Sequence, residues 1–488
     1  MKQPLYTQLS ENLAAFKAMF GTSTDFYTRQ IRICGKDGAI LMFEGLGSLN
    51  TLWNIFLEAV ARNIPFGGED VSALSGEQIV QQLLYASDLP SDNTPVEDFE
   101  MAVTKLTAGM ALILVDGSCK AIALSVQDMK FRSVDTPASE GNLRGSREGF
   151  CDLLRINVTL LRRMIRTTGL VIEIRQSPSQ NKAEYALCYD KTKAPPDMVD
   201  QIKAALQQAQ PAFLLDSSYY SPWLSPAKQR LFTPVGYTER PAVASAKICE
   251  GKVVVLVNGS PSAMILPYLF AENFDCLDDY GGTAYFASFI RLLKYLSFYL
   301  TVFLPGMFVA AAVYTPELIP PAILYKVAAA EKATPLPLFA EMLLVIALLE
   351  MIREAGLRMP QSLGHSVSLV AALIIGDAAI STGILSTPCI IVASVTSIAM
   401  FLTPSLYEPA TILRMLFLLA GGLAGPAGIA FGVVALVLHL SQLQLYGVYY
   451  TAEVLPFSRM AFRDGVIRRN YRRLSRQPYT IKEDRHES

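Results

Sequence analysis

The stretch Tyr295–Tyr314, YLSFYLTVFLPGMFVAAAVY, runs for 20 residues without a charged side chain. As an α-helix it would be about 30 Å long, which matches the hydrocarbon core of a bilayer. Arg291 and Lys294 come just before it, and cationic residues at the end of a span mark the cytoplasmic side. The stretch therefore predicts a membrane-spanning helix that begins in the cytoplasm.

Charged residues are scarce after this stretch. Between Ala355 and Leu440 the only full charges are Arg358, Asp377, Glu408 and Arg414, far fewer than a water-facing surface carries. Four further stretches are candidate spans: Leu336–Ile352, Ser366–Leu385, Pro388–Leu402 and Met415–Leu440. The first contains Glu341 and Glu350, so it is either a span facing a protein interior or a helix in the membrane interface. Pro388–Leu402 reaches only about 22 Å as a helix, which suits a re-entrant segment or a helix with little tilt.

Glycine and proline interrupt two of these stretches. The candidates for hinges or close helix packing are Pro305, Gly306, Gly421, Gly425, Pro426, Gly428 and Gly432. Because these residues weaken helical hydrogen bonding, Met415–Leu440 is predicted to be broken or kinked. The spacings Gly421/Gly425 and Gly428/Gly432 favour close helix approach over a gating hinge.

Both flanks of the apolar half are predicted to be cytoplasmic. Met1–Phe20 lacks the apolar core of a secretion signal. Arg459–Arg476 holds seven arginines and one acidic residue, and a basic segment after the last span suits anionic lipid better than nucleic acid. The arginines expected at the membrane surface are Arg468, Arg469, Arg472, Arg473 and Arg476. This topology requires an even number of crossings, so one of the five candidates should not span, and Leu336–Ile352 and Pro388–Leu402 are the suspects.

The N-terminal half has the pattern of a soluble α+β domain. Strand-like runs alternate with stretches of helical period, and a polar stretch, 134–146, separates two subdomains. The predicted strands are Arg29–Gly35, Ala39–Glu44, Met110–Asp116, Ala121–Val126, Leu170–Arg175 and Ala183–Tyr189. The predicted helices are Asn50–Ala61, Glu77–Ala86, Val96–Ala108, Glu148–Arg166 and Asp197–Gln208. The predicted organisation is an N-terminal segment (1–24), cytoplasmic subdomains (25–140 and 141–250), a membrane-proximal connector (251–290), a helical transmembrane domain (291–445) and a basic tail (446–488).

The sequence gives no sign of an enzyme, a metal site or a cofactor. It lacks GxGxxG, GxxxxGK[ST] and GxSxG motifs, and its three histidines lie far apart. Its seven scattered cysteines form no CxxC pair, which indicates a reducing compartment rather than a zinc site. The near-zero net charge gives no reason to expect nucleic acid as a partner.

Several separated blocks of residues resemble one known family. Arg132-Ser133-Val134-Asp135, Glu140 and 144–150 (RGSREGF) are similar to its block RSVxEPxxExxxRGPREGF, although Ser146 replaces a proline and Thr136 precedes Pro137. Further blocks are 239–241 (ERP), 257–261 (VNGSP), 304–306 (LPG), 317–320 (ELIP), 353–356 (REAG) and 358–360 (RMP). With these blocks in the same order, the chain resembles the A-subunit (GerA) family of spore germinant receptors over about residues 25–475.

The resemblance implies a subunit of a nutrient-sensing complex in the spore inner membrane. Its partners would be a permease-like B subunit and a lipoprotein C subunit, and its homo-oligomer would form a channel for monovalent cations. A paralogous branch, associated with dipicolinic acid release, shares these blocks. A secondary transporter and a membrane scaffold are the other functions considered; no internal repeat in the apolar segments supports a transporter.

Asp377, Glu341 and Glu350 are the candidate pore-lining groups, because a carboxylate in an apolar segment must face water, a partner or a proton. A structural hydrogen bond for Asp377 and an interfacial face for the two glutamates are the alternatives. Arg353 or Arg358 could neutralise the glutamates. Arg144, Arg147 and Glu148 are expected at a subdomain or subunit contact, with anion binding by the two arginines as the alternative.

Overall fold

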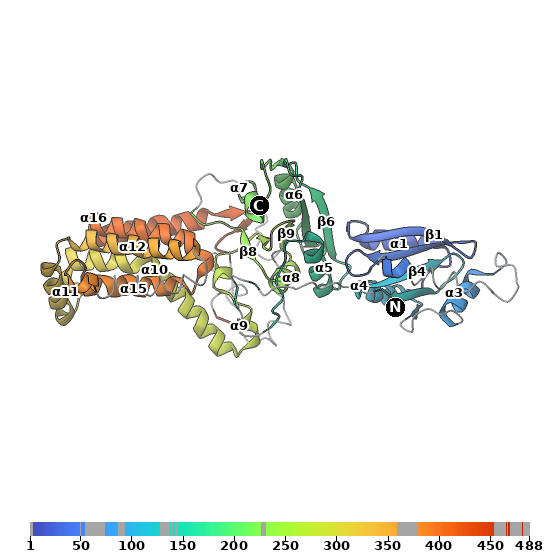
Figure 1. The fold of residues 1–488 in the computed structure, drawn as a ribbon, viewed down its shortest axis with the longest axis horizontal. Helices are drawn as coiled ribbons and strands as arrows, with labels where there is room; N and C mark the ends of the chain where they lie inside the picture. Colours follow the sequence, from blue (N-terminus) through green and yellow to red (C-terminus); the bar gives the residue numbers. More distant parts are fainter. Residues whose placement is uncertain are drawn as a thin grey trace.

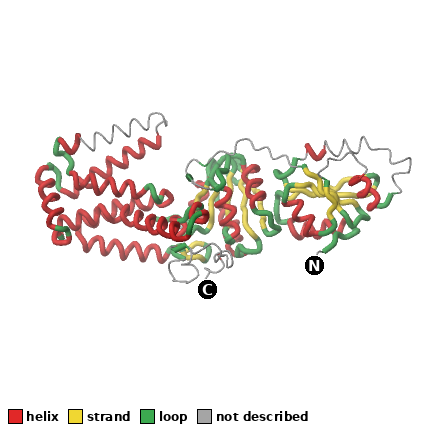
Figure 2. Tube along the Cα trace, turned by 90° about the horizontal axis from the view of Figure 1, so that it is seen from below, coloured by secondary structure: helices red, strands yellow, loops and turns green. Residues whose placement is uncertain are grey.

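The computed structural model describes residues 3–48, 50–53, 74–85, 93–126, 137, 140–141, 145–225, 231–358, 378–452, 465, 467–468 and 481. Three parts follow one another along the long axis of the molecule (Figure 1). Two α+β subdomains come first, and a bundle of long helices follows the second (Figure 2). The fold is therefore the predicted α+β domain of two subdomains joined to a helical domain.

The first subdomain is an antiparallel sheet covered by helices on both faces. Its strands are β1 (Phe26–Ile33), β2 (Lys36–Phe43), β3 (Thr94–Val96), β4 (Met110–Val115) and β5 (Ala121–Ser125), in the order β1-β2-β4-β5-β3. Successive side chains of β2 point to opposite faces. Leu41 packs with α1 (Leu9–Phe20) and α4 (Phe99–Thr107), whereas Ile40 packs with α3 (Gly76–Tyr85). The predicted helix at Asn50–Ala61 falls mostly outside the described residues.

The first residues of the chain belong to this core, which corrects the expected boundary between a segment 1–24 and a subdomain beginning at residue 25. Phe16 and Phe20 of α1 are fully buried against Phe43 and Phe99. Leu5 also enters this core. The polar composition of Met1–Phe20 hid this helix, because only one of its faces is apolar.

The second subdomain repeats the sheet-and-helix plan and extends past the expected boundary at residue 250. Its strands are β6 (Leu170–Gln176), β7 (Glu184–Asp190), β8 (Gly236–Thr238), β9 (Val253–Val257) and β10 (Ala263–Leu266), in the order β6-β7-β9-β10-β8. Helices α5 (Leu154–Met164) and α8 (Pro241–Cys249) cover one face, and α6 (Pro196–Gln208) covers the other. Because β9 is buried along its whole length inside the sheet, residues 253–266 are core rather than connector.

The C-terminal tail also completes the second core. A short hairpin, β11 (Gln444–Leu445) and β12 (Val448–Tyr449), places Leu445 and Val448 against the face that carries α6. Ile481 is fully buried in the same cluster, and its N–H donates to the carbonyl of Glu250 at 2.9 Å. The tail therefore does more than follow the bundle, because some of its described residues belong to the core of the second subdomain.

Among the described residues of the helical domain, two helices are long and apolar enough to cross a membrane. They are α10 (Ala284–Tyr314) and the stretch Pro404–Gln442, which includes α16 (Tyr407–Gln442). The pair α11 (Pro321–Ala333) and α12 (Leu338–Arg358) also passes as one broken span, bent by 82°. The shorter apolar helix α15 (Thr387–Met400) packs against α10 and α12.

Helix α16 reverses its direction at Gly425, where the backbone has φ 58° and ψ −145°. Gly432 lies against the ring of Phe417, and Gly428 lies against the carbonyl of Ala420. In a straight helix Phe417 and Gly432 would be about 22 Å apart. The predicted break is thus an antiparallel helical hairpin with arms of about 27 and 26 Å, each close to the thickness of a bilayer core.

The described helices run repeatedly between the two ends of the bundle. We call the end next to the second subdomain proximal and the opposite end distal (Figure 1). Helix α10 and the first arm of α16 run distally, whereas α12, α15 and the second arm of α16 run proximally. The described chain stops at Arg358 on the proximal side and resumes at Ala378 on the distal side. Most of the candidate span Ser366–Leu385 therefore lies outside the described residues.

A buried ion pair joins the two subdomains. Arg162 on α5 and Asp25 before β1 are both almost inaccessible, with Nη2 and Oδ1 2.8 Å apart. Arg162 also donates to Ser23 Oγ and to the carbonyl of Leu170. Beside it, the Thr24 N–H donates to the carbonyl of Ile172 on β6. Segment 23–25 therefore covers β6, the edge strand of the second sheet. An uncovered strand edge would be a template for pairing with another chain.

Replacement of Arg162 by Ala should destabilise the soluble part by about 3–5 kcal/mol, because it leaves the Asp25 carboxylate buried without its partner. Thermal unfolding of the purified chain would measure this loss. Arg155→Ala is the matched control, since Arg155 crosses the same boundary to Glu44 through an exposed pair and should cost under about 1 kcal/mol. Equal losses in the two variants would contradict a joint that depends on the buried pair.

Candidate functional site

Glu341 lies inside the bundle at the start of α12. Its side chain is fully buried, and Oε1 accepts a hydrogen bond from the backbone N–H of Ser386, the N-cap of α15. The N-terminus of a helix stabilises a nearby negative charge. Cys389, one turn into α15, lies in the same buried cluster of side chains. Glu341 therefore fixes α12 to the beginning of α15, rather than lying in the membrane interface.

Glu350, nearer the proximal end of α12, lies at the centre of a second polar group. It accepts hydrogen bonds from the Tyr407 hydroxyl at 2.6 Å and from the guanidinium of Arg414, which is almost completely buried. Arg353 lies 3.8 Å from Glu350 and covers the ring of Tyr407. Glu350 is thus neutralised by Arg414 on α16 together with the expected Arg353, whereas Arg358 pairs with Glu354.

The other residues singled out from the sequence lie apart from this group. Arg147 is exposed at the surface, and Glu148 pairs with Arg163 on α5 within the second subdomain. Asp377, Arg144 and four of the tail arginines lie outside the described residues: Arg469, Arg472, Arg473 and Arg476.

The predicted packing glycines lie where helices touch. A side chain on Gly306 of α10 would collide with the carbonyl of Phe417, and one on Gly421 of α16 would collide with the carbonyl of Gly306. Pro305 is a buried part of α10, and Pro426 follows the reversal at Gly425. The close approach of α10 and α16 therefore depends on Gly306 and Gly421.

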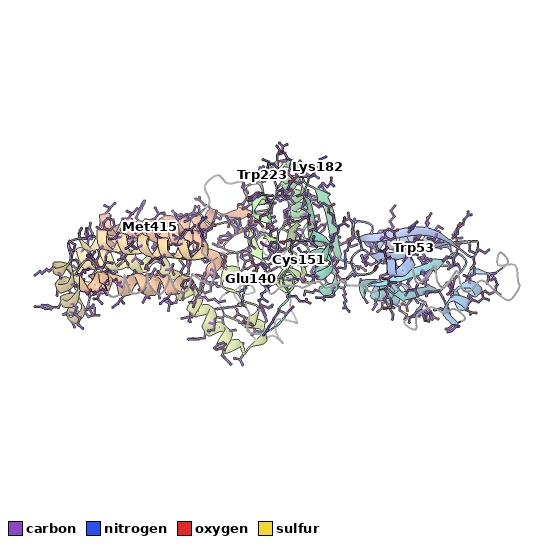
Figure 3. The ribbon with its side chains drawn as sticks, viewed as in Figure 1. Trp53, Glu140, Cys151, Lys182, Trp223 and Met415 are labelled. Carbon is purple, nitrogen blue, oxygen red and sulfur yellow. The ribbon has the colours of Figure 1, made fainter. Side chains whose placement is uncertain are left out.

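The motif around Glu140 fastens the linker between the subdomains. Thr238 donates to the Glu140 carboxylate at 2.9 Å, and Arg240 donates to the carbonyls of Glu140 and Ser146. Figure 3 labels Glu140 beside the second subdomain, well away from Trp53 in the first. Glu140, Ser146 and Phe150 therefore form hydrogen bonds with the ERP block at 239–241.

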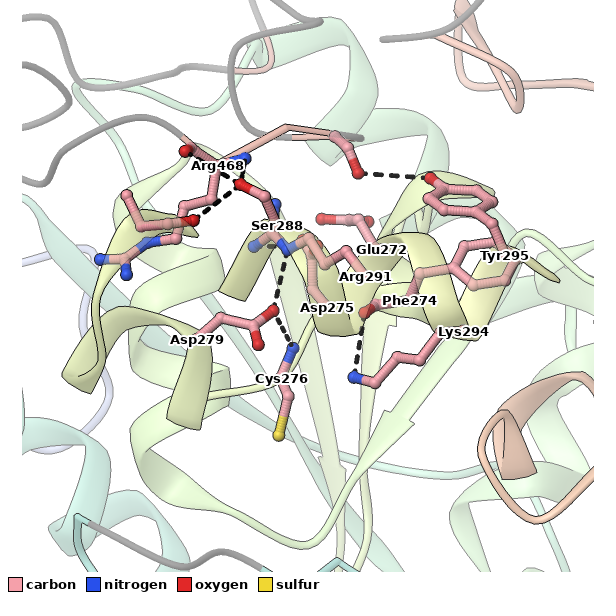
Figure 4. Close-up of polar contacts among 12 residues, drawn as sticks. Glu272, Phe274, Asp275, Cys276, Asp279, Ser288, Arg291, Lys294, Tyr295 and Arg468 are labelled. Carbon is pink, nitrogen blue, oxygen red and sulfur yellow. Dashed lines mark hydrogen bonds and ion pairs between the residues drawn. The ribbon is translucent and has the colours of Figure 1, made fainter. Parts of the chain in front are cut away.

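The junction between the second subdomain and the bundle is a compact polar cluster (Figure 4). Arg291 of α10 is fully buried and contacts Asp279 at 2.8 Å and Asp275 at 3.1 Å. Lys294 donates to the carbonyl of Phe274 at 3.0 Å. The two cations that precede the first apolar span are therefore bound to the protein itself.

Arg468 from the tail is part of the same junction, which corrects its expected place on the membrane surface. It is 3% exposed and donates to the carbonyls of Gly282 and Tyr280. Its backbone N–H donates to Ser288 on α10 at 3.1 Å (Figure 4). The chain segments just before the first apolar span and after the last one are thus bound together.

Behind this junction, Glu272 accepts hydrogen bonds from two lysines, Lys247 on α8 and Lys252 before β9. Burial alone would raise the pKa of the Glu272 carboxyl, but the two ammonium groups outweigh it and lower the pKa to about 2. This cluster leaves no motif in the sequence, since its three residues come from separate elements and share no spacing.

The sequence model of a protein family, described as Bacillus/Clostridium GerA spore germination protein, matches residues 14–480 of this chain. The chain belongs to the GerA family. Spore germination protein KA of Bacillus subtilis (strain 168) is 30% identical over 98% of this chain and 87% of its own length. The uncharacterized membrane protein YfkQ of the same strain is 28% identical over 98% of this chain and 92% of its own.

One solved structure aligns with the N-terminal half of this GerA family member. It is the N-terminal domain of the A subunit of the Bacillus megaterium spore germinant receptor GerK3, with 55% of this chain and 98% of that chain covered. The TM-score is 0.43 and the identity is 22%, a likeness too weak to assign a site.

Removal of the Glu350 carboxylate should cost about 3 kcal/mol, because Glu350→Ala leaves the Arg414 guanidinium in an apolar interior. The double variant Glu350→Leu/Arg414→Met should regain most of this loss, and melting of the chain in detergent would measure both. Glu354→Ala, which removes an exposed pair on the same helix, should change stability by under about 0.5 kcal/mol. A double variant no better than Glu350→Ala would show that the pair is not the source of the loss.

The low pKa of Glu272 makes the stability of the fold depend on pH. A carboxyl group whose pKa is lower in the folded state than in the unfolded state stabilises the fold. This contribution is complete at pH values above the unfolded pKa of about 4.3, and it is lost as the pH falls through the folded pKa of about 2. Glu272→Gln should therefore lower the melting temperature at pH 7, and its difference from wild type should shrink below about pH 4.3. Glu97→Gln, at an exposed pair with Lys120, is the control. A Glu272→Gln difference that stays constant down to pH 2 would disprove this linkage.

Proposed function

We propose that this chain is the membrane subunit of a nutrient germinant receptor in the spore inner membrane, and that several copies form a gated cation channel. Family membership supports the receptor role. A permease-like B subunit and a lipoprotein C subunit would be its partners. The soluble subdomains and the C-terminal residues would lie in the cytoplasm, in agreement with the cations before α10.

The contacts inside the bundle support a path between copies rather than through one copy. Glu341 is bound to the start of α15, and Glu350 is bound to Arg414 and Tyr407. The surrounding helices fill the space between them with apolar side chains. Because Glu341, Glu350 and Arg414 each form a hydrogen bond within one chain, we propose that cations move along a surface formed when copies assemble.

The junction at Arg291 and Arg468 is the proposed route from the soluble domain to that path. It holds the start of α10 against Asp275 and Asp279, which lie between the second sheet and α10. A movement of the second subdomain would therefore act directly on the first span. A gated protein needs the junction to transmit such a movement, whereas a scaffold would need it only to attach the second subdomain to the bundle.

Replacement of Asp377 by Ala should reduce the rate of cation release during germination if the carboxylate lines the path. Potassium efflux from spores, normalised to the amount of the chain in their membranes, would measure the change. Glu317→Gln, at an exposed distal position, should leave efflux unchanged. Unchanged efflux in Asp377→Ala at normal protein levels would remove Asp377 from the path.

Reconstitution of the purified wild-type chain in liposomes distinguishes the proposed channel from a secondary transporter. A channel gives a current that does not saturate with cation concentration, whereas a transporter gives saturable uptake of a substrate. The paralogous role in dipicolinic acid release predicts retention of this compound in spores that lack the chain.

A further inference from the structure

The first part of α10 turns its apolar side chains away from the protein. Between Ala284 and Leu296, large apolar side chains recur every three or four residues on one face of the helix and are exposed. They are Tyr285, Phe286, Phe289, Leu292, Leu293 and Leu296. Tyr285 is 91% exposed, and Phe289 and Leu292 are 61% and 60% exposed. A soluble protein rarely exposes so large an apolar patch unless something else covers it.

The cationic residues of the same turns face inward. Arg291 is fully buried against Asp279, and Lys294 donates to the carbonyl of Phe274. A helix at the surface of a soluble protein has the reverse arrangement, with its charged side chains outside. Charged residues that face the protein and pair there are typical of a helix surrounded by lipid. The start of α10 therefore has the polarity of a membrane helix.

Helix α10 is also longer than a hydrocarbon core is thick. Its 31 residues form a helix of about 46 Å, whereas the core of a bilayer is about 30 Å thick and the bilayer with its headgroup regions about 40–45 Å. In Figure 1 the start of α10 extends beyond the proximal ends of α15 and α16 and diverges from them. The exposed apolar face therefore lies where the lipid headgroups would be at the proximal end of the bundle.

A segment of the tail adds to this face. The backbone N–H of Arg468 donates to Ser288 Oγ, and the Tyr295 hydroxyl donates to the carbonyl of Gly465. Ile467, which lies between the two tail residues, is 54% exposed. Two parts of the chain that are far apart in the sequence thus expose apolar side chains at one level, beside the buried polar junction.

We propose that the first turns of α10, together with Ile467, insert into the boundary between headgroups and acyl chains of the leaflet at the proximal end. The inference rests on the membrane location in the proposed function, and it moves the membrane boundary from Tyr295 to about Tyr285. Lipid is the occupant because the face continues along the same helix into the span, and because it carries no charge over about 17 Å. Another protein would meet such a face with polar groups at its rim, whereas aromatic and leucine side chains are those that favour the lipid boundary.

This placement explains why the cations before the span are bound within the chain. Arg291 and Lys294 lose water at this depth, and their partners in the junction replace it. The junction is then held at the level of the headgroups. A movement of α10 in the membrane and a movement of the second subdomain therefore act on the same contacts.

Tryptophan fluorescence in nanodiscs of brominated phosphatidylcholine tests this placement. Phe289→Trp in the full-length chain should lose roughly half of its added fluorescence, because a face buried about 5–10 Å into the boundary reaches bromines on the acyl chains. The unaltered chain gives the background of Trp53 and Trp223, which lie in the soluble subdomains (Figure 3). Tyr85→Trp, at an exposed position of the first subdomain, is the matched control and should be quenched by aqueous acrylamide but not by bromine.

The quenchers separate the proposal from its alternatives. Quenching of Phe289→Trp by bromine supports it, whereas quenching by acrylamide alone would show that the face lies in water and overturn it. A tryptophan shielded from both quenchers would show that protein, such as a second copy, covers the face, which also overturns it.

Val434→Trp, exposed on the second arm of α16, reports on the membrane location itself. If bromine quenches Val434→Trp but not Phe289→Trp, the inference fails and the proposed function stands. If bromine quenches neither, the membrane location of the bundle fails as well.

Discussion

The reversal of the backbone at Gly425 determines where the rest of the chain lies. Two arms, each nearly as long as a bilayer core is thick, replace one long helix and bring residue 442 back to the proximal end. Within lipid, a turn of this kind must satisfy or shelter its polar groups. Tyr314 contributes to this, since its hydroxyl donates to the carbonyls of Gly422 and Leu423. The tail can reach the second subdomain only because of this return.

The sequence predicted those features that depend on local composition. Apolar length predicted α10, and alternation predicted the strands around Ile40, Ile113 and Ile172 close to their observed bounds. The glycine cluster predicted a break, but composition does not specify the positive φ that turns a kink into a hairpin. The reversal also changes the count of candidate crossings, because the single candidate Met415–Leu440 lies in a helix that forms two arms.

The features that the sequence did not predict depend on contacts between distant residues. Strand β9 is covered on both faces, so its run of valines lacks the polar alternation by which the other strands were predicted. Glu350 pairs with the nearby Arg353, but its closer cation, Arg414, lies on another helix. Arg468 looked like a surface residue in a basic tail, although the carbonyls that hold it belong to residues 280 and 282. Charge counts along a chain cannot identify such partners.

The contribution of the C-terminal residues to the second core has a consequence for biosynthesis. Leu445, Val448, Ala452 and Ile481 fill a cluster whose remaining buried members, from Val171 to Leu269, are translated before any membrane helix. During synthesis, that face of the sheet must remain incomplete until the last helix of the bundle and residue 481 have been synthesised. Maturation of the soluble domain thus comes after membrane integration, and a chain that ends prematurely leaves this apolar surface open to the cell's proteases.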